Sequence, residues 1–164
     1  MPEIILLAHN LRSSHNVGSL LRTAEGLGVN KVYLTGYTPY PARNGDTRLP
    51  HLAQKIERQI HKTALGAQKL IDWQAEANIQ QLLTDLRSDG YRLVALEQSA
   101  GAIALEDFVV PEKLALIVGR EVEGLEKEVL ARCDITVEIP MLGQKESFNV
   151  VQAAAMALYK IIFS

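Results

Sequence analysis

The sequence has little cysteine and few aromatic residues: one Cys, one Trp and three Phe among 164 residues. The single thiol, Cys133, cannot form an intrachain disulfide, which favours a reducing compartment such as the cytoplasm. We interpret Cys133 as a small hydrophobe rather than a nucleophile. With 48% hydrophobic and 5% aromatic residues, we expect one domain, residues 1–164, with a largely aliphatic core.

Long apolar runs and a strong net charge are also missing. No segment approaches the roughly 18 apolar residues of a membrane helix. The N-terminus is acidic and only briefly apolar, which predicts a strand rather than a secretory signal. The net charge of −2 gives no general attraction to nucleic acids or lipid surfaces. No membrane partner is therefore expected.

The motifs of several enzyme classes are absent. There is no G-x-x-x-x-G-K-[ST] phosphate loop, no G-x-S-x-G nucleophile elbow, and no G-x-G-x-x-G after a predicted strand. Four histidines without metal-ligand spacing and one cysteine predict no metal site. These absences disfavour P-loop, simple hydrolase, dinucleotide-binding and zinc-enzyme interpretations.

Apolar runs alternate with helical patterns along the chain. We expect strands at 4–8, 31–35, 70–73, 91–96, 114–118 and 135–139, and helices capped by Asn16 and covering 51–69, 79–86, 125–132 and 150–158. Residues 36–50 are rich in Gly, Pro, Asn and Asp and predict a long loop. This alternation is typical of an α/β domain with a mainly parallel sheet and helices on both faces.

The segment from Ile139 to Tyr159 organises the chain. Pro140 ends the last predicted strand because it has no N–H for a ladder, and Asn149 favours a helix start. The helix that follows is apolar on every face, so it needs cover all round. We therefore expect it to lie against the domain on one side and against a second subunit on the other.

Polar clusters follow three of the predicted strands, at 10–16, 119–124 and 143–149. The carboxyl ends of parallel strands meet at one edge of a sheet, where open α/β sheets bind ligands. We therefore expect the three loops to form one site. Arg and Asn side chains in these loops suit a sugar–phosphate ligand, and backbone groups at Gly119, Ile139 and Leu142 suit an adenine.

Three motifs occupy these loops in order. They are Asn10-x-Arg12-x-x-x-Asn16-x-Gly18-x-x-x-Arg22-Thr-Ala-x-x-x-Gly28, then Ile117-Val-Gly119-x-Glu121-x-x-Gly124-Leu, then Ile139-Pro-Met-x-Gly143-x-x-x-Ser147-x-Asn149-Val. Together they resemble the motifs of the SpoU/TrmH branch of the SPOUT RNA methyltransferases, and the resemblance covers essentially the whole chain. Any one motif alone would be weak.

The resemblance implies transfer of a methyl group from S-adenosylmethionine to a ribose 2′-hydroxyl of RNA. It also implies a homodimer and a C-terminal trefoil knot, a rare exception to the usual connection rules. We favour tRNA slightly over rRNA, because the sequence shows no extra RNA-binding domain. A non-catalytic RNA-binding relative and a base-modifying SPOUT methyltransferase stay open as alternatives.

The resemblance implies residue roles as well. The catalytic group would comprise Arg22, Asn16, Glu121, Ser147 and Asn149. The cofactor would be held, mainly through backbone atoms, by Leu96, Gly119, Ile139, Leu142, Ser147 and Phe148. An arginine loses its proton only at very high pH, so we expect Arg22 to orient the 2′-hydroxyl rather than to act as its base.

RNA contacts are expected in two places. Arg12 would hold a phosphate beside the site. The segment from Arg43 to Lys69 carries six Lys or Arg against two acidic residues and would supply Arg43, Arg48, Lys55 and Arg58. The same segment is equally consistent with an ordinary solvated face.

Overall fold

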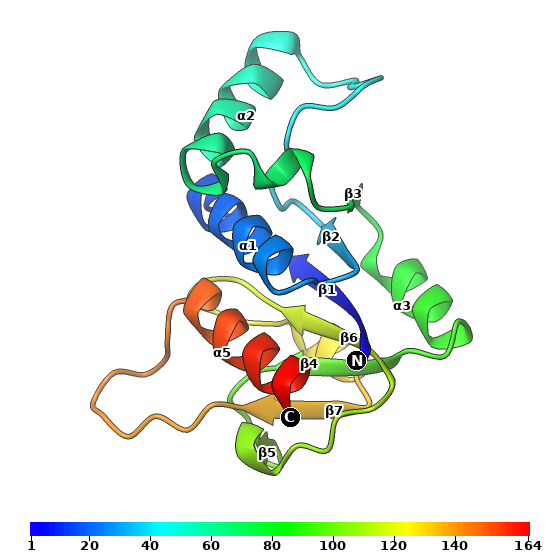
Figure 1. Cartoon of the computed structure of the whole chain (residues 1–164), viewed down its shortest axis with the longest axis vertical. Coiled ribbons are helices and arrows are strands. Elements are labelled where there is room, and N and C mark those ends of the chain that lie inside the picture. The colour runs from blue at the N-terminus through cyan, green and yellow to red at the C-terminus, as the bar shows by residue number, and fades with distance from the viewer.

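Seven strands and five α-helices follow one another along residues 1–164, all of which a computed structural model describes (Figure 1). In chain order they are β1 (Glu3–His9), α1 (Ser14–Gly26), β2 (Lys31–Thr35), α2 (Pro50–Ala64), β3 (Trp73–Glu76), α3 (Ile79–Ser88), β4 (Arg92–Leu96), β5 (Ile103–Ala104), β6 (Lys113–Val118), α4 (Lys127–Leu130), β7 (Ile135–Glu138) and α5 (Val150–Phe163). Short 3₁₀ turns lie at Ala67–Lys69 and Leu105–Asp107.

The strands form one sheet in the order β3-β2-β1-β6-β4-β7-β5. Every neighbouring pair is parallel, so the predicted parallel sheet is confirmed. At its centre Leu6 pairs with Val32 on one side and with Leu116 on the other. These central strands are continuous apolar runs because both of their faces are covered.

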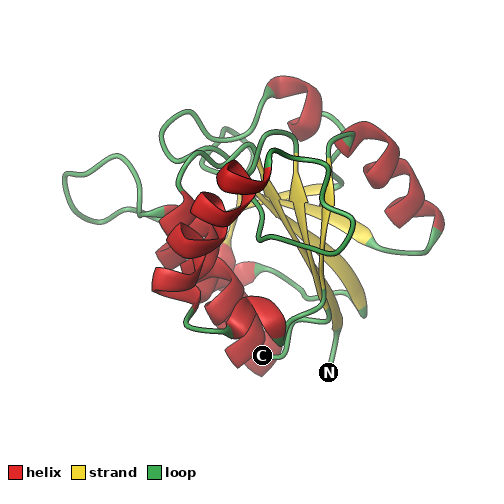
Figure 2. Cartoon of the chain, turned by 90° about the horizontal axis from the view of Figure 1, so that it is seen from above, coloured by secondary structure: helices red, strands yellow, loops and turns green.

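Helices cover the sheet on both faces, as Figure 2 shows. Alternate residues of each strand point to opposite faces, and they divide the core in two. Leu6, Val94 and Leu116 belong to the larger cluster with α1 and α5. Leu7 and Ile117 belong to a smaller cluster with the apolar residues of α3 and α4. Because all neighbouring strands are parallel, their carboxyl ends lie at one edge of the sheet.

The start of α1 differs from our expectation that Asn16 caps the helix. Ser13 is the cap, and its Oγ accepts the backbone N–H of Asn16 at 3.1 Å. The Asn16 side chain is thereby left free for contacts with other loops. The expected strand at 70–73 was also misplaced, because the chain turns at Ala67–Lys69 and pairs with β2 only from Trp73.

Two expected helices have different lengths in the structure. The helix expected at 125–132 spans only Lys127–Leu130. The helix expected at 51–69 is α2, which spans Pro50–Ala64 and so ends five residues earlier than expected. Leu65 ends it in the left-handed conformation, with φ +53°, and its N–H bonds the carbonyl of His61.

Helix α2 and the loop before it form an arm that stands off the β2 side of the sheet (Figure 1). The arm is joined to the body where α2 crosses α1. At this crossing a Cβ on Gly18 would lie 2.2 Å from the carbonyl oxygen of Ile60, and Thr63 Oγ1 donates to the carbonyl of His15 at 2.7 Å. Only glycine allows so close an approach of the two helices.

Helix α5 buries one face and exposes the other. Ala154, Leu158 and Ile161 are buried, whereas Tyr159 and Phe163 are 61% and 65% exposed. The loop between β7 and α5 reaches away from the body in Figure 1. The trefoil knot expected in this region stays a prediction. None of the helices combines the length and the apolar character that a transmembrane span requires.

Candidate functional site

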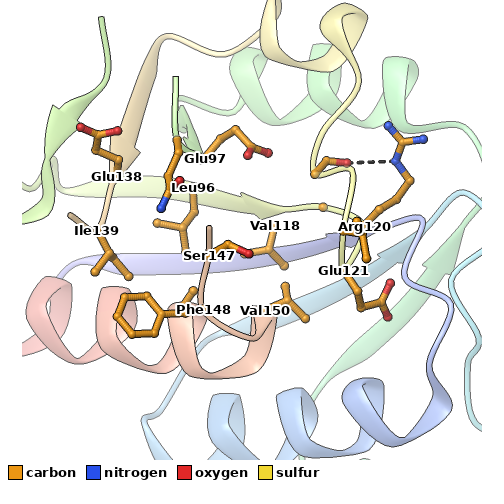
Figure 3. Close-up of a pocket in the computed structure, with 15 residues that line it drawn as sticks. Leu96, Glu97, Val118, Arg120, Glu121, Glu138, Ile139, Ser147, Phe148 and Val150 are labelled. Carbon is orange, nitrogen blue, oxygen red and sulfur yellow. Dashed lines mark hydrogen bonds between the residues drawn. The ribbon is translucent and has the colours of Figure 1, made fainter. Parts of the chain in front are cut away.

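A pocket of about 100 Å³ opens at the carboxyl ends of β4, β6 and β7 (Figure 3). Its lining comes from the ends of these strands, the loops after them and the first turns of α5. The lining residues are Leu96, Glu97, Gln98, Val118, Gly119, Arg120, Glu121, Val122, Gly124, Glu138, Ile139, Ser147, Phe148, Val150 and Ala153. The pocket is a concave site with both apolar and polar side chains in its lining, as ligand sites of proteins have.

The wall after β6 is a tight turn fixed by its own backbone. Arg120 and Gly124 form an antiparallel bridge, with N–H···O distances of 3.2 and 3.1 Å. Gly124 has φ +71°, and a Cβ there would lie 2.2 Å from Glu97 Oε2. The same oxygen accepts the N–H of Leu125 at 2.9 Å. The turn is therefore held against the end of β4, and Gly124 cannot be replaced without displacing Glu97.

A chain of side-chain hydrogen bonds joins the three loops beside the pocket. Asn149 Nδ2 donates to Asn16 Oδ1 at 3.4 Å, and Asn16 Nδ2 donates to Glu121 Oε1 at 3.4 Å. Asn149 also caps α5, because its Oδ1 accepts the N–H of Val151 at 2.8 Å. The loops after β1, β6 and β7 therefore meet at one place, which confirms the expected convergence.

Glu121 anchors this chain to the backbone after β1. Its carboxylate accepts the N–H of Ser13 at 3.0 Å and the N–H of Arg12 at 3.1 Å. Burial raises the pKa of Glu121, but the hydrogen bonds from Ser13, Arg12 and Asn16 outweigh burial and leave the pKa below its ordinary value. The side chain is therefore an anion at neutral pH and acts as an acceptor only.

A second network beside the pocket was missed by the sequence interpretation. His9 is buried, its Nδ1 lies 2.9 Å from Thr35 Oγ1 and its Nε2 lies 3.1 Å from Glu126 Oε2. Burial lowers the pKa of His9 more than the nearby Glu126 raises it. Glu126 also accepts Asn10 Nδ2 at 2.9 Å. The ring is thus neutral at pH 7 and ties the end of β1 to the turn after β6.

A polar His-Asn pair directly after an apolar strand was the only signal of this network in the sequence. Its partner Glu126 lies more than a hundred residues later and was assigned only to a short helix. Asn10 has φ +57°, which is uncommon for a residue with a side chain. Its Oδ1 accepts the N–H of Tyr37 at 3.0 Å, so this conformation also fixes the chain after β2.

The structure brings most of the expected cofactor residues together. Leu96, Gly119, Ile139, Ser147 and Phe148 all line the pocket. In Figure 3 Phe148 and Ile139 lie on one side, Glu121 lies on the other, and Ser147 lies between them.

Leu142 and Arg22 are placed elsewhere. Leu142 is 98% exposed in the projecting loop and is not part of the pocket lining. Arg22 is exposed on α1, six residues after Asn16, which is about 9 Å along the axis and on another face of the helix. Within one chain, Arg22 is therefore not part of the pocket wall.

The expected RNA-binding residues fall into two groups. Arg12 is exposed and forms an ion pair with Glu123 at the turn after β6. Arg43, Lys55 and Arg58 are exposed on the arm.

Arg48 behaves differently from these residues. Its guanidinium donates twice to Asp46, at 3.0 and 2.7 Å, and to the carbonyls of Tyr40 and Pro41, both at 3.0 Å. It also stacks 3.7 Å from the centre of the Tyr40 ring, and its side chain is only 15% exposed. Four of its five N–H donors are thereby used within the protein, so Arg48 organises the loop of the arm.

Comparison with known proteins identifies the family. The model of the SpoU rRNA methylase family matches residues 3–159, which include every element of the pocket. The chain belongs to the SpoU rRNA methylase family. The matched span contains the hydrogen-bonded side chains of Asn16, Glu121 and Asn149 and all residues that line the pocket. The site therefore lies within the part of the chain that the family shares.

Two curated relatives from bacteria are similar to this SpoU-family chain. A tRNA (guanosine(18)-2′-O)-methyltransferase from Borreliella burgdorferi is 28% identical over 97% of the chain and 66% of its own length. A 23S rRNA (guanosine-2′-O-)-methyltransferase, RlmB, from Neisseria meningitidis serogroup B is 28% identical over 96% of the chain and 57% of its own length. The chain therefore spans less than two thirds of either relative.

A solved SpoU-family structure shares the fold. The SpoU methyltransferase AviRb from Streptomyces viridochromogenes, in complex with the cofactor AdoMet, superposes with a TM-score of 0.77 and 25% sequence identity. The match covers 98% of this chain and 59% of AviRb. The parallel sheet with helices on both faces is thus the fold of this family.

Proposed function

We propose that the protein transfers a methyl group from S-adenosylmethionine to a ribose 2′-hydroxyl of RNA. The observation that carries the proposal is the hydrogen-bonded chain Asn149–Asn16–Glu121 at the side of the pocket. It joins the three family motifs in one place. The relatives named as guanosine 2′-O-methyltransferases of tRNA and rRNA support this reaction.

The pocket suits the proposed cofactor. Its apolar wall of Leu96, Ile139 and Phe148 fits the adenosine, and Gly119 lines the pocket beside this wall. Three carboxylates line the pocket, from Glu97, Glu121 and Glu138, against one guanidinium, from Arg120. S-adenosylmethionine has a net positive charge, so this excess of carboxylates favours it.

The cofactor, when bound, supplies a methyl group already activated by the sulfonium, so the proposed reaction needs no metal. The chain's own residues then position the acceptor. The Asn16 amide is oriented by Glu121 and Asn149. These hydrogen bonds hold the amide and carboxylate groups beside the pocket, where they can align a ribose. Ser147 adds a hydroxyl at the pocket wall. The negative charge of Glu121 also favours a nearby cation, such as a guanidinium.

That cation, in our proposal, is Arg22 of a second copy. Arg22 is exposed and lies outside the pocket of its own chain. Helix α1 packs beside α5, and the exposed Met156, Tyr159 and Phe163 of α5 form an apolar face that a homodimer would cover. A dimer formed there brings Arg22 of one subunit close to the other. The reducing environment of the cytoplasm suits the unpaired Cys133.

Two measurements test the reaction. Calorimetry should show S-adenosylmethionine binding to the wild-type protein, and no heat at millimolar cofactor would exclude the proposal. Arg22→Ala should abolish methyl transfer and leave cofactor affinity within about twofold of wild type. Glu25→Ala, at another exposed position of the same helix, is the matched control and should keep wild-type transfer.

Mixed dimers test the origin of the arginine. Subunits carrying Arg22→Ala and subunits carrying Glu121→Ala are each expected to be inactive alone. In a mixed dimer one site would combine an intact Arg22 with an intact Glu121, so partial activity should return. A mixed dimer that stays inactive would place Arg22 in the site of its own chain.

A further inference from the structure

The exposed face of α2 carries a row of basic side chains with a regular helical spacing. His51, Lys55, Arg58 and Lys62 follow the pattern i, i+4, i+7, i+11, which places them on one face of a helix. All four are exposed. The buried Ala53, Ile60 and Ala64 mark the opposite face of the same helix. The four residues, called the cationic row below, therefore point directly away from the body.

The cationic row has no acidic residue in it or beside it. Glu57 is the only carboxylate of α2, and it faces inward, where it accepts the N–H of Ala42 at 3.1 Å. The ion pairs of this region are Lys31–Asp72 and Arg48–Asp46. Lys55, Arg58 and Lys62 are therefore unpaired, on a chain whose net charge is −2.

The pocket, in contrast, is surrounded by negative charge. Glu97, Glu121 and Glu138 line it. Glu123 and Glu126 flank it in the turn after β6, where they pair with Arg12 and Arg120, so five carboxylates face two guanidinium groups. Carboxylates repel the phosphates of a nucleic acid, so the site itself cannot supply the long-range attraction for an RNA. That attraction has to come from another surface of the protein.

We propose that the cationic row of α2 is the surface that binds the RNA backbone and presents the RNA to the pocket. This inference rests on the proposed function, because it takes RNA as the substrate. The row extends over about 16 Å, and a strand of duplex nucleic acid carries one phosphate per ~3.4 Å of axis. The row can therefore contact several successive phosphates through Lys and Arg side chains without reading bases.

The joint between α1 and α2 sets the position of the row relative to the site. Gly18 and Thr63 hold α2 against the first turns of α1. The same turns carry Asn16, which belongs to the chain beside the pocket. A phosphate backbone bound along α2 is thereby aligned with the loop after β1. The arm is a fixed extension of the site and not a separate unit.

The test measures binding of fluorescently labelled total tRNA by anisotropy at 50–200 mM KCl. The double variant K55Q/R58Q removes two charges from the row, and the control K69Q/K127Q removes two exposed charges outside the row, one just after α2 and one on α4. Each lost phosphate contact lowers the salt slope by about one and, at 0.1 M salt, the affinity by up to about eightfold. We expect K55Q/R58Q to bind at least about tenfold more weakly and the control to bind within about twofold of wild type.

A permuted variant separates position from net charge. Q54K/K55Q/R58Q/Q59R exchanges neighbouring residues, so it keeps the composition and net charge of α2 but breaks the row, and it should bind tRNA as weakly as K55Q/R58Q. The proposal would be overturned if K55Q/R58Q and K69Q/K127Q lost the same tRNA affinity. It would also be overturned if the permuted variant bound tRNA as tightly as wild type. Unchanged tRNA binding by K55Q/R58Q would overturn it as well, and would instead indicate an acidic protein as the partner of this face.

The result is separable from the test of the reaction. If the wild-type protein binds tRNA through the row and methylates no RNA, the reaction is wrong and the binding surface stands. If methylation proceeds and the row variants bind tRNA normally, the surface is wrong and the reaction stands. S-adenosylmethionine binding serves as the folding control, because the row lies outside the pocket.

Discussion

Glu121→Gln is the most informative single change in the site. The substitution keeps the size of the side chain and one acceptor oxygen but removes the charge that receives the N–H groups of Arg12 and Ser13. Hydrogen bonds to a charged group contribute about 1.5–3 kcal/mol and neutral ones about 0.5–1.5 kcal/mol. Allowing for partial exposure, we expect a loss of about 1–2 kcal/mol, or about 2–8 °C in Tm for a domain of this size.

The same variant predicts a defined dependence on pH. The folded-state pKa of Glu121 lies below its ordinary value of 4.5. The ionised side chain therefore stabilises the fold above about pH 4.5, and this stabilisation is lost as the pH falls through the lower folded-state pKa. The difference in the free energy of unfolding between wild type and Glu121→Gln should be largest at pH 7 and should become smaller as the pH falls below 4.5. Urea unfolding at pH 7, 5 and 3.5 measures this difference.

Two comparisons make the prediction refutable. Glu123→Gln changes the same residue type in the same turn but touches only the exposed Arg12 side chain, so it should leave stability nearly unchanged. Glu121→Gln combined with Asn16→Ala should be non-additive by at least about 0.5 kcal/mol, since the two side chains share a hydrogen bond. Wild-type stability of Glu121→Gln at pH 7, or strict additivity of the two changes, would refute the claim that this carboxylate holds the loops together.

Three further predictions concern the arm and the core. Gly18→Ala places a methyl group against Ile60, so it should destabilise the protein by about 1–3 kcal/mol and weaken tRNA binding. Unchanged stability together with unchanged tRNA binding would contradict the claim that Gly18 fixes α2 against α1. Arg48→Lys cannot reproduce the paired contacts to Asp46, so limited proteolysis should cut residues 36–49 faster than in wild type. Burial raises the pKa of Cys133 to about 11, so iodoacetamide at pH 8 should alkylate the folded protein about a hundredfold more slowly than the unfolded one.

Most of the fold could be predicted from local patterns of apolar residues and glycines in the sequence. The apolar runs at 4–8 and 114–118 predicted strands, and both strands lie at the centre of the sheet. Gly28 and Gly90 end their helices in positive-φ conformations, as a helix stop requires. The convergence of three polar loops followed from one rule, that the carboxyl ends of parallel strands share an edge.

Contacts that depend on distant partners were beyond this reasoning. Ser13 and Asn16 are both good capping residues, and only the bonds of Asn16 to Glu121 and Asn149 decide which of them caps α1. A composition count grouped Arg48 with the RNA-binding residues. Its geometry instead commits four of its five N–H donors to the loop of the arm.

The two-residue strand β5 is too short to produce a periodic signal. Likewise, periodicity identifies an apolar helix such as α5 but cannot tell which part of its surface a second subunit would cover. Met156 and Phe163 became identifiable as the uncovered part only once the helix was placed against the sheet. Such assignments need the tertiary arrangement.

The most direct test of the central claim is to identify the methylated nucleoside. The protein is incubated with methyl-labelled S-adenosylmethionine and total RNA from cells that lack it, and the RNA is digested to nucleosides for mass spectrometry. The account predicts label on a 2′-O-methylated ribose with wild-type protein and none with Arg22→Ala. Label on a base, or equal ribose labelling by the variant, would contradict it.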